Sequence, residues 1–178
     1  MWFAIPKEGV MGLMEIGANW ETIRNLFRNS FLSSLHYAMA TTNADGSPHV
    51  TPIAALILRE DRTGFYFEVY TDKMSKNLSK DRRVCVMAVN SDLLFWARSF
   101  MEGKFDVPPA VRLGGTVGER REATQEEIAV WRERVEFARE MKGYDLLWKT
   151  MRYVRDIYFD SFEPVYLGAM TAELWKSP

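Results

Sequence analysis

The sequence predicts a mainly β fold in which short antiparallel strands form a small closed barrel with helices attached. Residues 65–70 alternate, so that Phe65, Phe67 and Val69 lie on one side of a strand and face a core. Asp45-Gly46 stands between two apolar runs and is a strong signal for a β-hairpin. Short strands joined by tight turns of this kind favour a small closed barrel.

One helix and a series of strands are expected in the first half of the chain. Trp20, Ile23 and Phe27 recur at spacings of three and four, which places them on one face of a helix at residues 19–35. Asn19 is a candidate cap for this helix. The elements that follow are strands at 36–42, 48–58, 65–71 and 82–90, with a turn and short helix at 72–81.

Pro52 is unusual because it comes soon after the hairpin turn, within the predicted strand 48–58. Proline donates no hydrogen bond to a ladder, so it is confined to sheet edges and bulges. A departure from regular pairing is therefore expected at this point of the strand.

The second half of the chain predicts a strand, two helices and a last strand. Residues 91–109 follow no clear pattern, and the strand at 110–121 contains glycines where another group is expected to come close. Thr124 and Glu127 form a capping box. The helix that they open carries an apolar stripe of Ile128, Trp131, Val135 and Ala138, and Gly143 can close it. The remaining elements are a short helix at 144–154 and a strand at 164–175.

The length, composition and charge of the chain limit the classes of protein to which it can belong. The chain has 178 residues, of which 47% are hydrophobic, so one domain with a sizeable core is expected over residues 1–178. The formal net charge of −1 gives no drive toward nucleic acid or an anionic membrane. No apolar run approaches the length that spans a bilayer, and no signal peptide is recognisable, so a cytoplasmic protein is expected.

Several chemistries are unsupported by the residues present. Cys85 is the single cysteine, expected to pack as a small buried apolar residue, and the two histidines are His36 and His49. No metal site is therefore predicted. No catalytic side chain is predicted either, because the chain has no G-x-S-x-G elbow and no P-loop. The glycines at 114–118 are not followed by a helix at the spacing that a Rossmann fingerprint requires.

A set of polar residues after the strand at 65–71 suits a phosphate. Tyr70 and Thr71 end the strand, and Ser75, Lys76 and Asn77 follow within one turn of helix. Hydroxyl groups, an ammonium group and free N–H groups at a helix start are what a phosphate needs. Polar turns that contain lysine are common, so this signal is weak when it stands alone.

The ordered series of motifs resembles the FMN-binding split-barrel family typified by pyridoxamine 5'-phosphate oxidase. The shared pattern begins with the hairpin A-T-x-x-x-D-G-x-P-H-V-T-P. It continues with a strand that ends in Tyr-Thr, then Ser-Lys, a later leucine and a V-x-V strand. The resemblance covers about residues 19–127 and implies a six-stranded antiparallel split β-barrel, with a helical insertion at about 124–154.

The resemblance also implies a homodimer with two FMN sites at the subunit interface. The residues that it places beside the flavin ring are His49, Val50, Thr51 and Pro52. Those that it places at the phosphate are Tyr70, Thr71, Ser75 and Lys76, with Asn77 as a weaker candidate. Trp96 and Arg98 are candidates for reaching the flavin across the interface.

The implied function is that of an FMN-dependent oxidoreductase acting on a small substrate, with a nicotinamide as electron donor. The family's C-terminal Arg-x-His, which grips a substrate phosphate, has no counterpart in residues 164–178, which argues against a vitamin B6 oxidase. One alternative is a flavin-binding carrier or sensor without turnover. Another is a split barrel that binds haem, through His36 or His49, or F420, through a basic groove formed by Lys73, Lys76, Lys80, Arg82 and Arg83.

Overall fold

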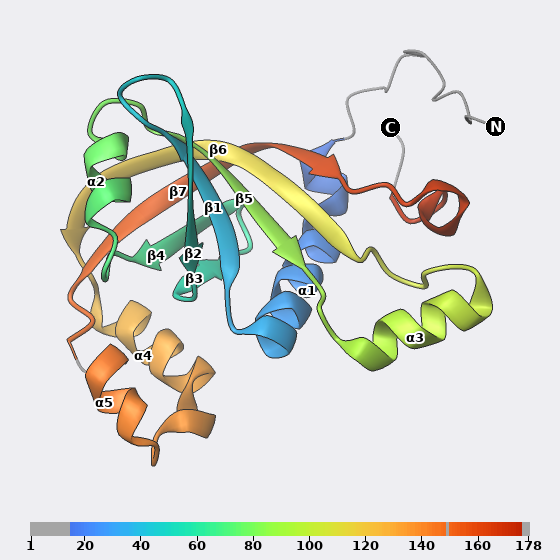
Figure 1. Ribbon diagram of the computed structural model, residues 1–178. Helices are drawn as coiled ribbons and strands as arrows, with labels where there is room; N and C mark the ends of the chain where they lie inside the picture. The colour runs from blue at the N-terminus through green and yellow to red at the C-terminus, as the bar shows by residue number, and fades with distance from the viewer. Residues whose placement is uncertain (1–14, 149, 176–178) are drawn as a thin grey trace.

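The computed structural model describes residues 15–148 and 150–175. Seven antiparallel strands form one sheet in the order β2-β1-β5-β6-β7-β4-β3, which curls into a half-closed barrel (Figure 1). The strands are β1 (Tyr37–Thr42), β2 (Pro48–Ile53), β3 (Leu56–Leu58), β4 (Thr63–Phe67), β5 (Arg83–Val89), β6 (Ala110–Glu122) and β7 (Tyr153–Pro164). Because β2 and β3 are consecutive in the chain and yet form opposite edges of the sheet, the sheet has to curl.

Five α-helices lie around this sheet in the described part of the chain. They are α1 (Ile16–Ser34), α2 (Asp72–Leu78), α3 (Leu93–Glu102), α4 (Gln125–Arg134) and α5 (Lys142–Trp148), with short 3-10 turns at Glu136–Ala138 and Gly168–Thr171. None of these helices has the length and apolar character needed to cross a membrane. The predicted mainly β fold with added helices is confirmed.

The core lies between α1, the concave face of the sheet and α4. Trp20, Ile23 and Phe27 are buried on α1, as their spacing predicts. Trp131 and Val135 of the α4 stripe belong to the same cluster of buried side chains. The segment after residue 124 therefore packs into the main core instead of forming a core of its own.

The strand predictions need three corrections, of which the first is that β4 ends at Phe67, whereas the prediction continued this strand to residue 71. The sheet has seven strands instead of six, because the predicted strand 48–58 is interrupted at Ala54 and Ala55 and divides into β2 and β3. The last strand is β7 at Tyr153–Pro164, whereas the prediction placed it at 164–175. The apolar pattern of Leu146, Leu147 and Trp148 favours a helix that continues to residue 154. Instead, the chain from Tyr153 onward pairs with both β4 and β6 and belongs to the sheet.

Three local predictions also differ from the structure. Residues 91–109 contain helix α3, which Asp92 caps by accepting a hydrogen bond from the N–H of Phe95, and which Gly103 ends with a φ of 70°. Asn19 lies inside α1, whose first residue is Ile16, instead of capping it. Cys85 is half-buried instead of fully buried, and this burial raises the pKa of its thiol.

The glycines of β6 allow a close approach of β7, as predicted. A Cβ atom at Gly115 would lie 2.5 Å from the carbonyl oxygen of Tyr158. The pairing register between the two strands shifts at Gly114 and Gly115. The group that comes close is therefore the neighbouring strand, and the shift bends β6 around the barrel.

A cluster of ion pairs fixes α4 to the sheet. Arg121 of β6 forms two-pronged contacts of 2.7–2.9 Å with both Glu127 and Asp156. Arg59 joins the same two carboxylates at 2.7 and 2.9 Å. Glu127 also completes the predicted capping box with Thr124, so one carboxylate both starts the helix and anchors it.

We expect this cluster to make the protein sensitive to acid. The hydrogen bond from Arg121 holds the pKa of Asp156 below its ordinary value. A depressed pKa stabilises the folded state above the unfolded value of about 3.9, and this contribution is lost as pH falls through the folded pKa. Asp156→Asn should therefore lower the free energy of unfolding at neutral pH by about 1 to 2 kcal/mol and flatten its dependence on pH below about 4. Urea unfolding at a series of pH values measures both effects, and equal slopes in the two proteins would disprove this role.

Candidate functional site

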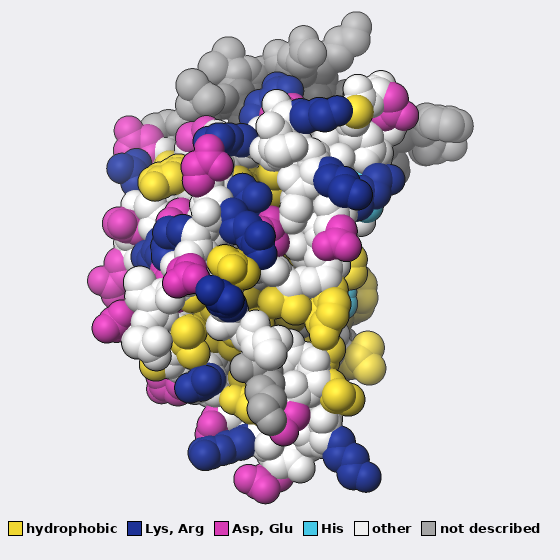
Figure 2. Space-filling view, turned by 90° about the vertical axis from the view of Figure 1, so that its left-hand side faces the viewer, with side chains coloured by type: hydrophobic (Ala, Val, Ile, Leu, Met, Phe, Trp, Pro, Cys, Tyr) yellow, Lys and Arg dark blue, Asp and Glu magenta, His cyan; other side chains and the backbone are white. Residues whose placement is uncertain are grey.

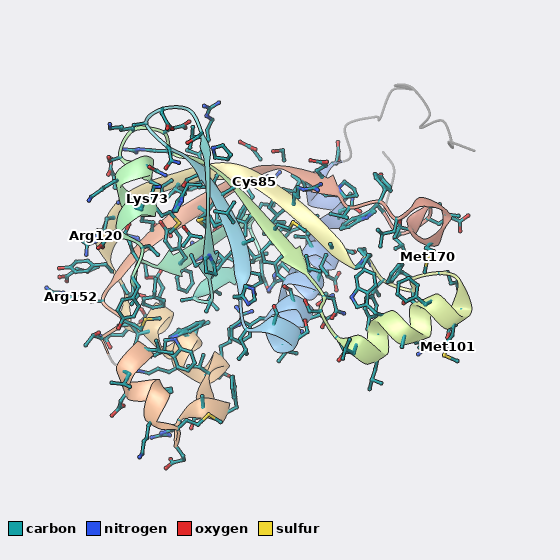
Figure 3. The ribbon with its side chains drawn as sticks, viewed as in Figure 1. Lys73, Cys85, Met101, Arg120, Arg152 and Met170 are labelled. Carbon is teal, nitrogen blue, oxygen red and sulfur yellow. The ribbon has the colours of Figure 1, made fainter. Side chains whose placement is uncertain are left out.

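A polar cleft of about 370 Å³ lies between helix α2 and the adjoining ends of β6 and β7. After β4 ends, Tyr70 adopts a left-handed backbone with a φ of 56°, and this turn sends the chain into α2. In Figure 3, Lys73 on α2 and Arg120 on β6 lie at the same end of the molecule. The cleft is lined by Glu68, Tyr70, Thr71, Asp72, Ser75, Lys76, Arg120 and Arg155.

Four residues predicted to hold a phosphate line this cleft together: Tyr70, Thr71, Ser75 and Lys76. Thr71 is only 8% exposed, and its hydroxyl group has no hydrogen-bond partner among the described residues. Lys76 is exposed and forms no ion pair within the described chain. The cleft therefore offers a buried hydroxyl group and an ammonium group that the protein itself does not use.

Glu68 organises the back of the cleft. Its side chain is 5% exposed and accepts hydrogen bonds from Nε of Arg155 at 2.9 Å and from the hydroxyl of Ser75. Nε of Arg120 lies 3.0 Å from the second carboxylate oxygen, and the guanidinium group stacks 3.8 Å from the ring centre of Tyr153. Both arginines thus meet Glu68 through Nε, which holds their guanidinium groups in fixed orientations.

The charge of the cleft favours an anion. Lys76, Arg120 and Arg155 outnumber the carboxylates Glu68 and Asp72. Figure 2 shows Lys and Arg side chains interspersed with Asp and Glu over this side of the molecule. The positive potential is therefore local to the cleft, as the formal net charge of −1 requires.

Asn77 does not line the cleft. Its side-chain amide donates hydrogen bonds of 3.1 Å to the hydroxyl of Thr41 and to the side-chain oxygen of Asn43. Asn77 is buried and ties α2 to the β1–β2 hairpin. It therefore fixes the residues predicted to hold the phosphate, around α2, relative to those predicted beside the flavin ring, on β2.

The residues predicted beside a flavin ring lie on β2, an edge strand of the sheet. His49 and Thr51 are half-buried on one face, where Nε2 of His49 and the hydroxyl of Thr51 lie 3.1 Å apart. Val50 and Pro52 are exposed on the other face. The departure from regular pairing that was expected at Pro52 does not occur, because the register of β2 with β1 continues through Pro52. The edge position accounts for the proline, since β2 pairs with β1 alone.

Trp96 and Arg98 are not brought near the cleft within one chain. Both lie on α3, which projects from the end of the molecule opposite α2 (Figure 1). The indole N–H of Trp96 donates to the carbonyl of Asn90 at 2.6 Å, and Arg98 pairs with Glu102 at 2.8 Å. Any contact of these two side chains with the cleft requires a second copy of the chain.

Sequence reasoning missed Glu68, Arg120 and Arg155. Arg155 lies opposite both Arg120 and Tyr66 in the sheet, so this register brings distant parts of the chain together. No local motif signals that arrangement. Glu68 is the one acidic residue in the run FYFEVYT, and the alternation of that run places it opposite Phe65, Phe67 and Val69 without indicating a role.

Comparisons with known proteins bear on the family and the fold of the chain. The family model described as pyridoxamine 5'-phosphate oxidase matches residues 27–158. No curated protein sequence matches the chain.

Solved structures share the fold at low sequence identity. An FMN-binding protein from Syntrophomonas wolfei subsp. wolfei gives a TM-score of 0.58 at 13% identity, with 84% of this chain and 89% of that chain covered. HupZ from Group A Streptococcus gives 0.53 at 17% identity, with 84% and 96% covered. An F420 reductase gives 0.51 at 13% identity, with 79% and 94% covered. At these identities the likeness shows the fold alone.

Proposed function

Since the chain belongs to the pyridoxamine 5'-phosphate oxidase family, we propose that it is an FMN-dependent oxidoreductase that acts on a small substrate and takes electrons from a reduced nicotinamide. The observation that carries this proposal is the hydroxyl group of Thr71, which is buried in a cationic cleft without a partner among the described residues. Buried polar groups in proteins are nearly always hydrogen-bonded, and this hydroxyl lines a cleft that also holds cationic side chains, so a ligand there would give it a partner.

The residues of the cleft fit the phosphate of FMN. A phosphate oxygen would accept from Thr71 and Lys76, and the terminal nitrogens of Arg120 have no hydrogen-bond partner in the described ranges. Charge-assisted contacts to arginine and lysine are the strong ones for phosphate. Glu68 does not block them, because it engages Arg120 and Arg155 through Nε.

FMN held there would supply the hydride or electron transfer, so that the protein needs no acid or base of its own. The chain's contribution is binding and orientation. Asn77 fixes the β1–β2 hairpin against α2, so His49 and Thr51 are held at a set place relative to the phosphate residues. That arrangement supports a role for residues 49–52 beside the flavin ring.

A homodimer with two cofactor sites at its interface is part of the proposal. Val50 on the edge strand β2 is 59% exposed, and Leu93, Leu94 and Met101 on α3 are exposed as well. Large apolar side chains gathered on one element favour a protein interface. In the dimer, α3 of one protomer brings Trp96 and Arg98 to the flavin of its partner.

Removal of the Thr71 hydroxyl is expected to change the affinity for FMN and the stability of the apoprotein in different ways. Thr71→Val keeps the shape and removes a hydroxyl that has no partner in the described protein. We expect FMN affinity to fall about threefold to tenfold, while the free energy of unfolding of the apoprotein stays equal or rises. Flavin fluorescence titration and urea unfolding measure the two quantities. A loss of stability without a loss of affinity would assign Thr71 a purely structural role.

Anaerobic reduction tests the oxidoreductase activity. The FMN-loaded protein is mixed with NADH or NADPH, and the flavin absorbance is followed with time. Bleaching that is faster than for free FMN is the expected result. A flavin that stays oxidised with both donors would contradict the proposed donor and favour a flavin carrier or sensor.

A further inference from the structure

A second cavity, of about 480 Å³, lies apart from the polar cleft, between α1, β3 and α4. Cavities of about 300 to 1,000 Å³ are the size that holds small molecules. Residues of α1 line it at the spacing of one helical face, and α4 closes the opposite side. Its apolar walls are Phe27, Phe31, Leu32, Ile57, Leu58 and Val130.

Arg134 presents a preset guanidinium group to this cavity. One terminal nitrogen donates to the carbonyl of Leu56 at 2.8 Å, and the other donates to the hydroxyl of Tyr37 at 2.7 Å. The guanidinium group also stacks 4.2 Å from the ring centre of Phe31. These contacts fix its plane, although they use only two of its five N–H donors.

Arg134 differs from the other arginines that the fold partly buries. Arg59, Arg121 and Arg155 each form ion pairs with carboxylates. Arg134 has only neutral acceptors in the described part of the chain. Arg134 is half-buried, and even partial removal of a charge from water without a counter-ion is costly, so this exception needs a cause.

No group in the cavity walls neutralises Arg134. Burial raises the pKa of Tyr37 to about 12, so its hydroxyl stays neutral at physiological pH. Glu133 lines the cavity but makes no ion pair within residues 15–148 and 150–175. Arg24 and Arg28 line it too, and Arg24 has only a distant 3.6 Å contact with the exposed Glu60. One carboxylate therefore faces three guanidinium groups.

We propose that this cavity binds a small carboxylate with an apolar body, such as a medium-chain fatty acid or an arylalkanoate. The carboxylate accepts from the free N–H donors of Arg134, and the apolar body lies against Phe27, Ile57 and Leu58. A planar guanidinium group suits a carboxylate because it can donate two parallel hydrogen bonds. This site is independent of the flavin cleft, with which it shares no lining residue.

Calorimetric titration of the full-length protein with octanoate tests the proposal, and octan-1-ol serves as the neutral probe. Arg134→Gln should weaken octanoate binding about tenfold or more, the loss expected for a charge-assisted contact. Arg132→Gln is the matched control, because Arg132 is exposed on α4 and does not line this cavity. Octanol should bind more weakly than octanoate to the unmodified protein.

A second variant keeps the test valid where Arg134→Gln disturbs folding. Val130 is 44% exposed at the cavity wall, so Val130→Trp can fill the cavity without rebuilding the core. Octanoate binding should be lost in this variant, and FMN binding should be retained. Octanoate that does not bind, that binds Val130→Trp as tightly as the unmodified protein, or that binds no better than octanol would overturn the proposal.

Discussion

Replacement of Trp131 by alanine is expected to lower the free energy of unfolding by about 3 to 5 kcal/mol. Trp131 is 0% exposed, and its ring packs against Phe31, Phe67 and Trp148 at centroid distances of 5.8–6.4 Å. The indole N–H has no partner among the described residues, so the loss comes from packing and not from a hydrogen bond. Urea unfolding followed by circular dichroism gives the value.

Arg132→Ala is the control, because Arg132 lies next to Trp131 on the same helix and its side chain is exposed. This variant should change the free energy of unfolding by less than about 0.5 kcal/mol. Trp131→Ala should also keep a single cooperative transition, because α4 shares the core of the barrel. Two separate transitions, or a loss below about 1 kcal/mol, would mean that residues 124–154 are an independent appendage.

Replacement of Lys76 by alanine is expected to weaken FMN binding about tenfold. The ammonium group lines the cleft and has no ion pair in the described protein, so its removal affects the ligand more than the fold. Flavin fluorescence titration of the apoprotein measures the affinity. Riboflavin, which lacks the phosphate, should bind Lys76→Ala and the unmodified protein equally well.

Lys73→Ala separates a specific contact from general electrostatics. Lys73 is exposed on the same helix α2 but does not line the cleft. Its removal should change FMN affinity less than twofold at physiological ionic strength, because exposed charges are screened. Equal losses in the two variants would show that the phosphate is not held at Lys76.

The elements that could be predicted from the sequence are those with local signals. Trp20, Ile23 and Phe27 mark the buried face of α1, and the capping box at Thr124 marks the start of α4. Helix α3 had its own signals, Asp92 and Gly103, but its exposed apolar residues hid the amphipathic pattern. The boundary of β7 could not be predicted from the sequence, because it depends on pairing with β4 and β6.

The residues of the candidate site likewise include some that the sequence predicts and some that only the fold brings together. Tyr70, Thr71, Ser75 and Lys76 come from one continuous stretch, so their meeting in one cleft follows from the turn between β4 and α2. Glu68, Arg120 and Arg155 meet only because the register of β6, β7 and β4 aligns them. Asn77 shows the limit of a local motif, since its side chain faces the β1–β2 hairpin and not the cleft.

The visible absorption spectrum of the purified protein, before and after titration with FMN, tests the central claim most directly. We expect a flavin spectrum, either at once or after saturable binding of FMN, and we expect Lys76→Ala to require more FMN for the same signal. A Soret band would establish haem instead, and saturable binding of F420 with no binding of FMN would establish a deazaflavin protein. A protein that binds none of the three would contradict the assignment of the α2 cleft as a cofactor site.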